Sequence, residues 1–399
     1  MAPTPSSIPL AKRRRRRRRA KRSRVVASIA HSDWRDWASL SFGPAVLIAE
    51  RVLSANLADY VRLRAVCSTW RRCTEDPRAD ARGGALDRRF HPRQWIMLDD
   101  SVGRVRPRHS RFLNVSTGEC VRMELPELTG RVVLAPTPEG LLLLLNDDET
   151  HAVCLLNPLT GSRTDLPPAT ALLSGYKPDR FFQRSTGNEE ALEVYGVGIA
   201  HDSTVVVNFG EHRQLAVARP GNDHWTRLRC EEDRIRGPIL SFAGRVYCIV
   251  CETVMVVETS PDEHPPRLAK VAMIGDPIGR SSRPLHNVLD TLHLVDNGGE
   301  LMVVHRIPRI AFISFDIYTI CEKSYRVDLE AGTTTIVNGN FGGRKLFIGM
   351  RRTLSVPAGL SPFITAESDC VRMDRGKERV QPHSIVECIC RYLGGHKRR

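Results

Sequence analysis

Two short segments of this 399-residue chain repeat one pattern at an offset of 43 residues. Residues 113–118 read LNVSTG and residues 156–161 read LNPLTG, and a Leu-Pro pair follows each of them. Asn with Thr-Gly is typical of a turn that passes through the left-handed backbone region between two strands. The offset matches one four-stranded β-propeller blade, which takes about 40 to 50 residues. The repeat therefore favours a propeller.

Short aliphatic runs recur through the same part of the chain, separated by Gly, Pro, Asn and Asp. We expect a β-strand in each of them, and they cover residues 132–134, 141–145, 152–156, 204–209, 246–250, 254–257, 301–305, 311–315 and 346–348. A region of about 300 residues would hold six or seven blades. Radial blades also protect the sheet edges that an open sheet exposes. A pair of β-sandwiches or an irregular β-rich domain stays open as the alternative.

A different pattern precedes the strands, in residues 37–73. Apolar residues at 46–48, 52 and 53 predict an amphipathic helix that starts near Pro44, because proline is accepted in a first helical turn. Residues 54–56 (SAN) predict a break after it. Two or three helices bury little surface by themselves. They therefore either present an apolar face to a partner or pack on their own domain.

The second helix predicted in this block carries one apolar stripe. Tyr60, Leu63, Val66, Cys67 and Trp70 follow the three-and-four spacing of a helix face. The arginines fall largely on the opposite side, which we expect to face solvent, and they are Arg62, Arg64, Arg71 and Arg72. Asp76-Pro77 predicts the end of the helix.

The helical block resembles an F-box, the segment that F-box proteins insert into the adaptor Skp1. Leu40, Leu47-Ile48 and Leu53 carry the resemblance, together with residues 59–71, which read DYVRLRAVCSTWR. The resemblance implies an Skp1-binding set of Leu40, Leu47, Ile48, Leu53, Leu57, Leu63, Val66, Cys67 and Trp70. One departure is the start: an F-box usually opens with Leu-Pro and a leucine-rich turn, whereas SFGPA follows Leu40 here. The start of the helical block therefore offers fewer apolar contacts to Skp1 than a usual F-box does.

Later segments resemble a plant family that joins an N-terminal F-box to a C-terminal KIB-type β-propeller. The matching landmarks are residues 89–98 (RFHPRQWIML), 156–161, 166–168, 299–304 and 346–349. The resemblance implies a non-catalytic substrate receptor in an Skp1-cullin-F-box ubiquitin ligase, with a protein target on the propeller and the ligase chemistry in other subunits.

The domain organisation that we predict is mainly β, with a small helical F-box module before a propeller of six or seven blades. A disordered basic tail occupies residues 1–30, the helical module 34–75, a linker 76–88, the propeller 89–395 and a basic end 396–399.

The net charge of +14 comes from the two ends of the chain. Eleven positive charges lie in an N-terminal basic cluster of Lys12, Arg13, Arg14, Arg15, Arg16, Arg17, Arg18, Arg19, Lys21, Arg22 and Arg24. The other three are Lys397, Arg398 and Arg399. Such a cluster is typical of a nuclear import signal, which predicts the nucleus, with the cytoplasm as a second compartment. A solvated tail without function is one alternative. The other is a nuclear nucleic-acid-associated protein that acts through the arginine-rich arm. The body between the ends is neutral and favours protein over nucleic acid as a partner.

No catalytic or metal-binding spacing stands out. The chain lacks HExxH, GxxxxGK and GxSxG motifs. Cys248 and Cys251 have the spacing of half a zinc site, but no second Cys or His pair completes it. We therefore expect no catalytic residue, metal or cofactor. No apolar run reaches the length of a membrane helix, so we also expect no membrane partner.

Overall fold

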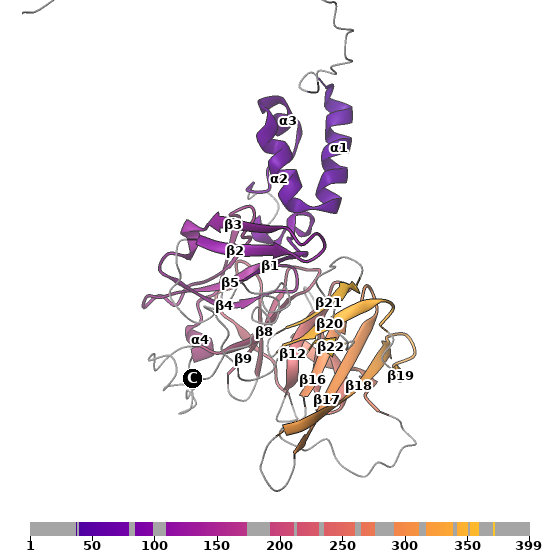
Figure 1. Cartoon of the computed structure of the whole chain (residues 1–399). Helices are drawn as coiled ribbons and strands as arrows, with labels where there is room; N and C mark the ends of the chain where they lie inside the picture. Colours follow the sequence, from indigo (N-terminus) through magenta and orange to yellow (C-terminus); the bar gives the residue numbers. More distant parts are fainter. Residues whose placement is uncertain are drawn as a thin grey trace, which may run out of the picture. The chain divides into compact units, whose positions relative to one another are not determined.

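The computed structural model describes residues 37, 40–79, 84–98, 109–173, 192–210, 214–230, 235–259, 265–275, 291–310, 317–337, 341–349, 352–358 and 370–371. The chain forms two compact units, Met1–Leu40 and Ser41–Arg399. The second unit contains all the helices and strands that follow (Figure 1). No helix in the described ranges combines the length and the apolar character that crossing a membrane requires.

Three helices open the second unit: α1 (Phe42–Ala55), α2 (Leu57–Val66) and α3 (Ser68–Cys73). The first helix begins two residues before Pro44, the predicted start. Asn56 has an extended backbone and ends α1, and its side-chain oxygen accepts a hydrogen bond of 3.1 Å from the N–H of Ala58. The predicted break at 54–56 is therefore confirmed, and an asparagine N-cap starts α2.

The prediction that the residues from Tyr60 to Trp70 form one stripe of one helix is wrong. Cys67 has an extended backbone (φ −152°, ψ 162°) and separates α2 from α3. Its thiol sulfur accepts a hydrogen bond of 3.4 Å from the N–H of Trp70, so a side chain satisfies a backbone group that a continuous helix would satisfy itself. Tyr60 and Trp70 consequently belong to different helices. The last helix ends at Cys73, three residues before Asp76.

Strands make up about half of the described chain. The strands are β1 (Trp95–Met97), β2 (His109–Asn114), β3 (Cys120–Glu124), β4 (Arg131–Pro136), β5 (Leu142–Asn146), β6 (Val153–Leu156), β7 (Arg163–Leu166), β8 (Val194–Ile199), β9 (Val205–Phe209), β10 (Gln214–Ala218), β11 (Thr226–Arg227), β12 (Ile235–Phe242), β13 (Arg245–Val250), β14 (Thr253–Glu258), β15 (Arg267–Met273), β16 (Thr291–Asp296), β17 (Leu301–Ile310), β18 (Ile317–Asp328), β19 (Thr333–Val337), β20 (Arg344–Ile348), β21 (Thr353–Pro357) and β22 (Cys370–Val371). The short helix α4 (Thr170–Leu173) follows β7. Eight of the nine predicted strand segments coincide with these strands, and residues 311–315 lie outside the described residues.

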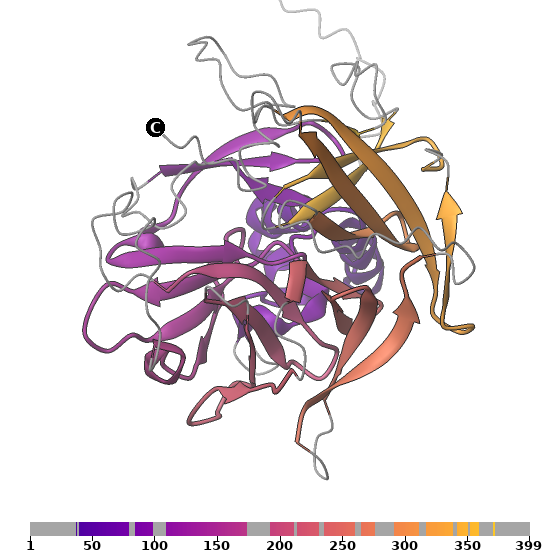
Figure 2. The same cartoon turned by 90° about the horizontal axis from the view of Figure 1, so that it is seen from below.

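The strands form six sheets within the described part of the chain. Four sheets each contain four strands that are consecutive in sequence and antiparallel: β4 to β7, β8 to β11, β12 to β15 and β16 to β19. The first sheet has the order β1-β2-β3, and the last has the order β21-β20-β22 with β22 parallel to β20. Figure 2 shows the sheets arranged around a common centre. The chain is thus mainly β, and this arrangement is that of a propeller.

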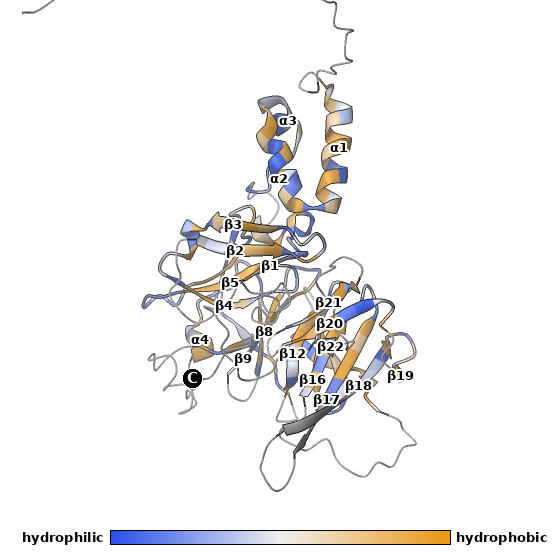
Figure 3. Cartoon of the chain, viewed as in Figure 1, coloured by the Kyte–Doolittle hydropathy of each residue, from blue (hydrophilic) through white to orange (hydrophobic). Residues whose placement is uncertain are grey.

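The apolar core lies between neighbouring sheets. Trp95 and Phe112 of the first sheet share one buried cluster with Leu144 of the second sheet and Phe347 of the last. The first and last sheets are therefore packed together, which closes the ring. Strands such as β9 and β13 are buried along most of their length, which explains why their sequences are mainly apolar. Figure 3 shows the same apolar character, in orange, for strand β5.

The repeated segments form matching turns. One joins β2 to β3 and the other joins β6 to β7. In each turn the asparagine Oδ1 accepts hydrogen bonds from the N–H groups two and three residues later, at 2.9 and 3.2 Å after Asn114 and at 3.1 and 3.3 Å after Asn157. Gly118 and Gly161 adopt φ values of 75° and 72°. The left-handed turns predicted from the repeat are confirmed.

Candidate protein-binding surface on the helices

Large apolar side chains are exposed on the helices. Among the residues that the structure describes, the exposed large hydrophobic side chains are Trp37, Phe42, Leu47, Ile48, Val66, Met273, Leu329 and Ile336. Four of these eight lie in α1 and α2, although the helices are a small fraction of the described chain. Exposed apolar side chains concentrated on neighbouring helices make these helices the candidate interaction site.

The first helix has two distinct faces. Ala45 and Ala49 are buried, and Val52 and Leu53 pack partly against the same core. The opposite face carries Pro44, Leu47, Ile48 and Arg51, which share it by the three-and-four spacing and are all exposed; we call this set the α1 strip. Leu47 exposes 67% of its surface and Ile48 exposes 38%. The strip is an apolar helix face without a covering element in the described part of the chain.

A compact core supports the strip from behind. Leu57 and Tyr60 of α2 pack with Ala49 and with Phe90, and the rings of Tyr60 and Phe90 lie 5.8 Å apart. Leu53 and Leu63 pack against this cluster. Burial raises the pKa of the Tyr60 phenol, which stays protonated and donates a hydrogen bond of 2.8 Å to the carbonyl oxygen of Glu75.

The residues predicted to bind Skp1 divide between surface and core. Leu47, Ile48 and Val66 are exposed, with Val66 exposing 66% of its surface. Leu40, Leu53, Leu63, Cys67 and Trp70 are half-buried. Leu57 exposes only 4% of its surface, so in the free chain it supports the helices from within. Its packing against Phe90, distant in sequence, gave no local signal.

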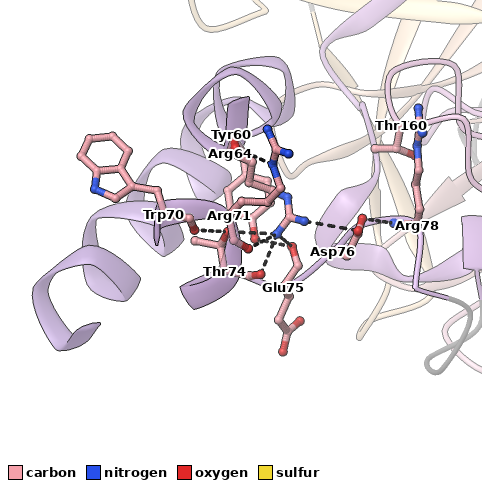
Figure 4. A network of polar contacts seen from close by, with 9 residues as sticks. All are labelled: Tyr60, Arg64, Trp70, Arg71, Thr74, Glu75, Asp76, Arg78 and Thr160. Carbon is pink, nitrogen blue, oxygen red and sulfur yellow. Dashed lines mark hydrogen bonds and ion pairs between the residues drawn. The ribbon is translucent and has the colours of Figure 1, made fainter. Parts of the chain in front are cut away.

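Arg64 also differs from the prediction, which placed it in solvent. Its side chain lies under the end of α3 and the residue exposes only 9% (Figure 4). Nη1 donates to the carbonyl oxygens of Thr74 and Glu75, both at 2.6 Å, and to Thr74 Oγ1 at 2.9 Å. Nη2 lies 3.3 Å from the carboxylate of Asp76. A guanidinium has five N–H donors and can satisfy several carbonyl groups at a helix end at once.

The sequence also draws attention to the Cys248 and Cys251 pair and to the two basic ends of the chain. In the described ranges no three His, Cys, Asp or Glu residues lie close enough to hold a metal ion. Cys248 is buried in β13, and burial raises the pKa of its thiol, whereas Cys251 lies in the turn after the strand. The basic cluster of residues 12–24 and the basic end 396–399 lie outside the described residues.

Comparison with known proteins identifies the propeller. A protein-family model described as KIB1-4 beta-propeller matches residues 112–377, well over half of the chain. The chain belongs to the KIB1-4 β-propeller family. The match begins inside β2, so it covers the KIB1-4 propeller and not the three helices. A comparison with curated protein sequences gives no match.

Solved structures resemble the KIB1-4 propeller only distantly. YCF48 from Cyanidioschyzon merolae is 12% identical with a TM-score of 0.33, covering 63% of this chain and 75% of that one. A putative 6-phosphogluconolactonase from Bacteroides uniformis is 13% identical with a TM-score of 0.30, covering 61% and 81%. The dihydro-heme d1 dehydrogenase NirN is 16% identical with a TM-score of 0.28, covering 58% of this chain, which spans 45% of NirN. At this level the similarities say nothing about activity.

Proposed function

We propose that this chain is the substrate receptor of an Skp1-cullin-F-box ubiquitin ligase. The helices α1 to α3 bind an Skp1-type adaptor, and the KIB1-4 propeller binds a protein target that the other subunits ubiquitinate. The observation that carries the proposal is the exposed α1 strip, because it lies on the helices whose sequence resembles an F-box.

Burial of the strip would supply binding energy. Leu47 exposes about two thirds of its surface in the free chain, and Ile48 exposes more than a third. Burying one aliphatic side chain of this size contributes about 1.5 to 3 kcal/mol. The supporting core holds α1 through Ala49, Val52 and Leu53, so little backbone conformational entropy is lost on binding.

The charge of α1 and α3 favours an acidic partner. Arg51 shares the exposed face of α1, and Arg71 and Arg72 are exposed on α3. Glu50 is the only acidic residue of α1, and α3 contains none. Complementary charge raises the association rate, so adaptor binding should weaken with salt.

Target binding falls on the propeller. Each of the two repeated turns contacts the helical segment or the residues that follow it: Glu119 pairs with Arg62, and the carbonyl oxygen of Thr160 accepts from Arg78. The loops and strands away from these contacts are the surface that we assign to the target.

Co-expression with an Skp1-type adaptor from the same source tests the proposal. The unmodified chain should copurify with the adaptor, whereas Leu47→Asp and Ile48→Asp should not. Met273→Asp is the matched control, because Met273 of β15 exposes 70% of its surface but lies on the propeller. Absence of the adaptor with the unmodified chain, or equal loss with Met273→Asp, would refute the proposal.

A further inference from the structure

One side-chain oxygen joins the helices to the propeller. Trp95 lies in β1 and exposes only 2% of its surface, and its indole Nε1 donates a hydrogen bond of 3.0 Å to Oδ1 of Asn56. The same Oδ1 accepts from the N–H of Ala58 and caps α2. A buried indole N–H without an acceptor is unfavourable. The asparagine that caps α2 therefore also supplies the acceptor for the buried indole of the first sheet.

A second connection is apolar. Phe90 lies between the helices and the first sheet in sequence, and it packs in the helical core with Leu57 and Tyr60. Its carbonyl oxygen accepts a hydrogen bond of 2.6 Å from Nδ2 of Asn157, the asparagine of the second repeated turn. The core of the helices is therefore completed by a residue that the propeller holds.

The third connection runs through the segment predicted to be a linker. Arg64 holds the backbone of Thr74 and Glu75, and its Nη2 contacts Asp76. Asp76 Oδ1 accepts from the N–H of Arg78 at 3.0 Å, and the Arg78 side chain donates to the carbonyl oxygen of Thr160 in the turn between β6 and β7 (Figure 4). Residues 74–78 are therefore bound at one end by Arg64 of α2 and at the other end by the β6-β7 turn.

We propose that Asn56 and Arg64 are coupling residues, which make the helices one cooperative folding unit with the part of the propeller that they contact, namely the β1-β2 pair and the β6-β7 turn. A partner bound to the helices is then held in a fixed orientation to the propeller, and its binding is transmitted to β1. Only this use of the coupling rests on the proposed function. The coupling itself follows from the three connections and from the single compact unit Ser41–Arg399.

The competing arrangement is a separate helical module on a flexible tether. It predicts that the loss of one contact loosens the helices alone. Cooperative coupling predicts instead that the disturbance appears on both sides of the contact, because each side completes the core or the hydrogen bonds of the other.

Hydrogen–deuterium exchange of the full chain, without any adaptor, separates the two. Trp95→Phe removes the donor and keeps the ring, whereas Asn56→Ser keeps a helix cap but is too short to reach Trp95. We expect each change to speed exchange about tenfold in both α2 and the β1-β2 pair, the size of one lost hydrogen bond. The strands β9 and β13, in other sheets, should stay unchanged. The double variant should exchange no faster than either single variant.

Arg64→Met extends the test to the third connection. It should speed exchange in α2, in residues 74–78 and in the β6-β7 turn, whereas the exposed Arg72→Met should change none of them. Faster exchange in the helices alone, or additive effects of Trp95→Phe and Asn56→Ser, would overturn the proposal.

The adaptor provides a second, independent readout. Trp95→Phe should still copurify with it, since the α1 strip is unaltered. Adaptor binding should slow exchange in β1-β2 of the unmodified chain and not of Trp95→Phe. If the adaptor does not bind at all, the proposed function fails while the exchange experiment without adaptor still decides the coupling.

Discussion

The guanidinium of Arg64 lies against Thr74, with Nη1 2.6 Å from its carbonyl oxygen and 2.9 Å from its hydroxyl oxygen. These hydrogen bonds connect α2 to the residues that directly follow α3. Arg64, which was predicted to face solvent, therefore helps to hold the helices together.

Loss of the Arg64 side chain should destabilise the chain strongly. Arg64→Met leaves the part-buried carbonyl oxygen of Thr74 without its Arg64 donor and the Glu75 carbonyl oxygen with Tyr60 alone, and a loss of about 1 to 3 kcal/mol in the free energy of unfolding is expected. Arg72→Met removes an exposed cation and should change it by less than about 0.5 kcal/mol. Chemical denaturation of both variants measures the difference, and equal effects would contradict the assignment.

Stability should fall in mild acid because of His91. Burial, with Arg93 and Arg88 nearby, lowers the pKa of His91 from 6.5 to about 4. As the pH falls from 6.5 to about 4, the unfolded chain takes up a proton at this site and the folded chain does not, so up to about 3 kcal/mol of stability is lost.

Unfolding experiments at several pH values measure this slope, with His91→Asn as the comparison. The variant should lose less stability than the unmodified chain over the same interval. Identical slopes would show that His91 titrates normally in the folded chain.

Leu57 and Leu47 should respond in opposite ways to truncation. Leu57→Ala removes a buried side chain and should cost about 2 to 4 kcal/mol of unfolding free energy. Leu47→Ala should leave stability nearly unchanged and weaken adaptor binding. Thermal unfolding and copurification on the same two proteins check both halves, and a stability loss confined to Leu47→Ala would reverse the assignment of core and surface.

The two repeated turns offer a matched pair of glycine substitutions. Both Gly118 and Gly161 have positive φ, so alanine costs roughly 1 kcal/mol at either position. An added Cβ at Gly118 meets open space, whereas at Gly161 it lies 3.1 Å from Glu127 Oε1. Gly161→Ala should therefore be the more destabilising in denaturant titration. A larger effect of Gly118→Ala would contradict the turn geometry.

The strands and the repeated turns were predictable because their signals are local. An aliphatic run such as 246–250 is continuous because both faces of β13 are buried, and Asn with Thr-Gly determines its turn through contacts within five residues. These features depend little on distant parts of the chain.

The helices were harder to predict because their details depend on longer-range contacts. Apolar spacing continues across Cys67, so periodicity could not show that one extended residue divides α2 from α3. Burial of Arg64 depends on carbonyl groups up to eleven residues later, and burial of Leu57 depends on Phe90. Neither contact leaves a periodic pattern.

A calorimetric titration of the purified chain with a purified Skp1-type adaptor measures directly whether the α1 strip binds the adaptor. We expect saturable one-to-one binding that Leu47→Asp weakens by about 30-fold or more, as expected for an apolar residue central to an interface. Met273→Asp should bind like the unmodified chain. Absence of binding heat by the unmodified, folded chain, or an affinity that Leu47→Asp does not change, would contradict the account.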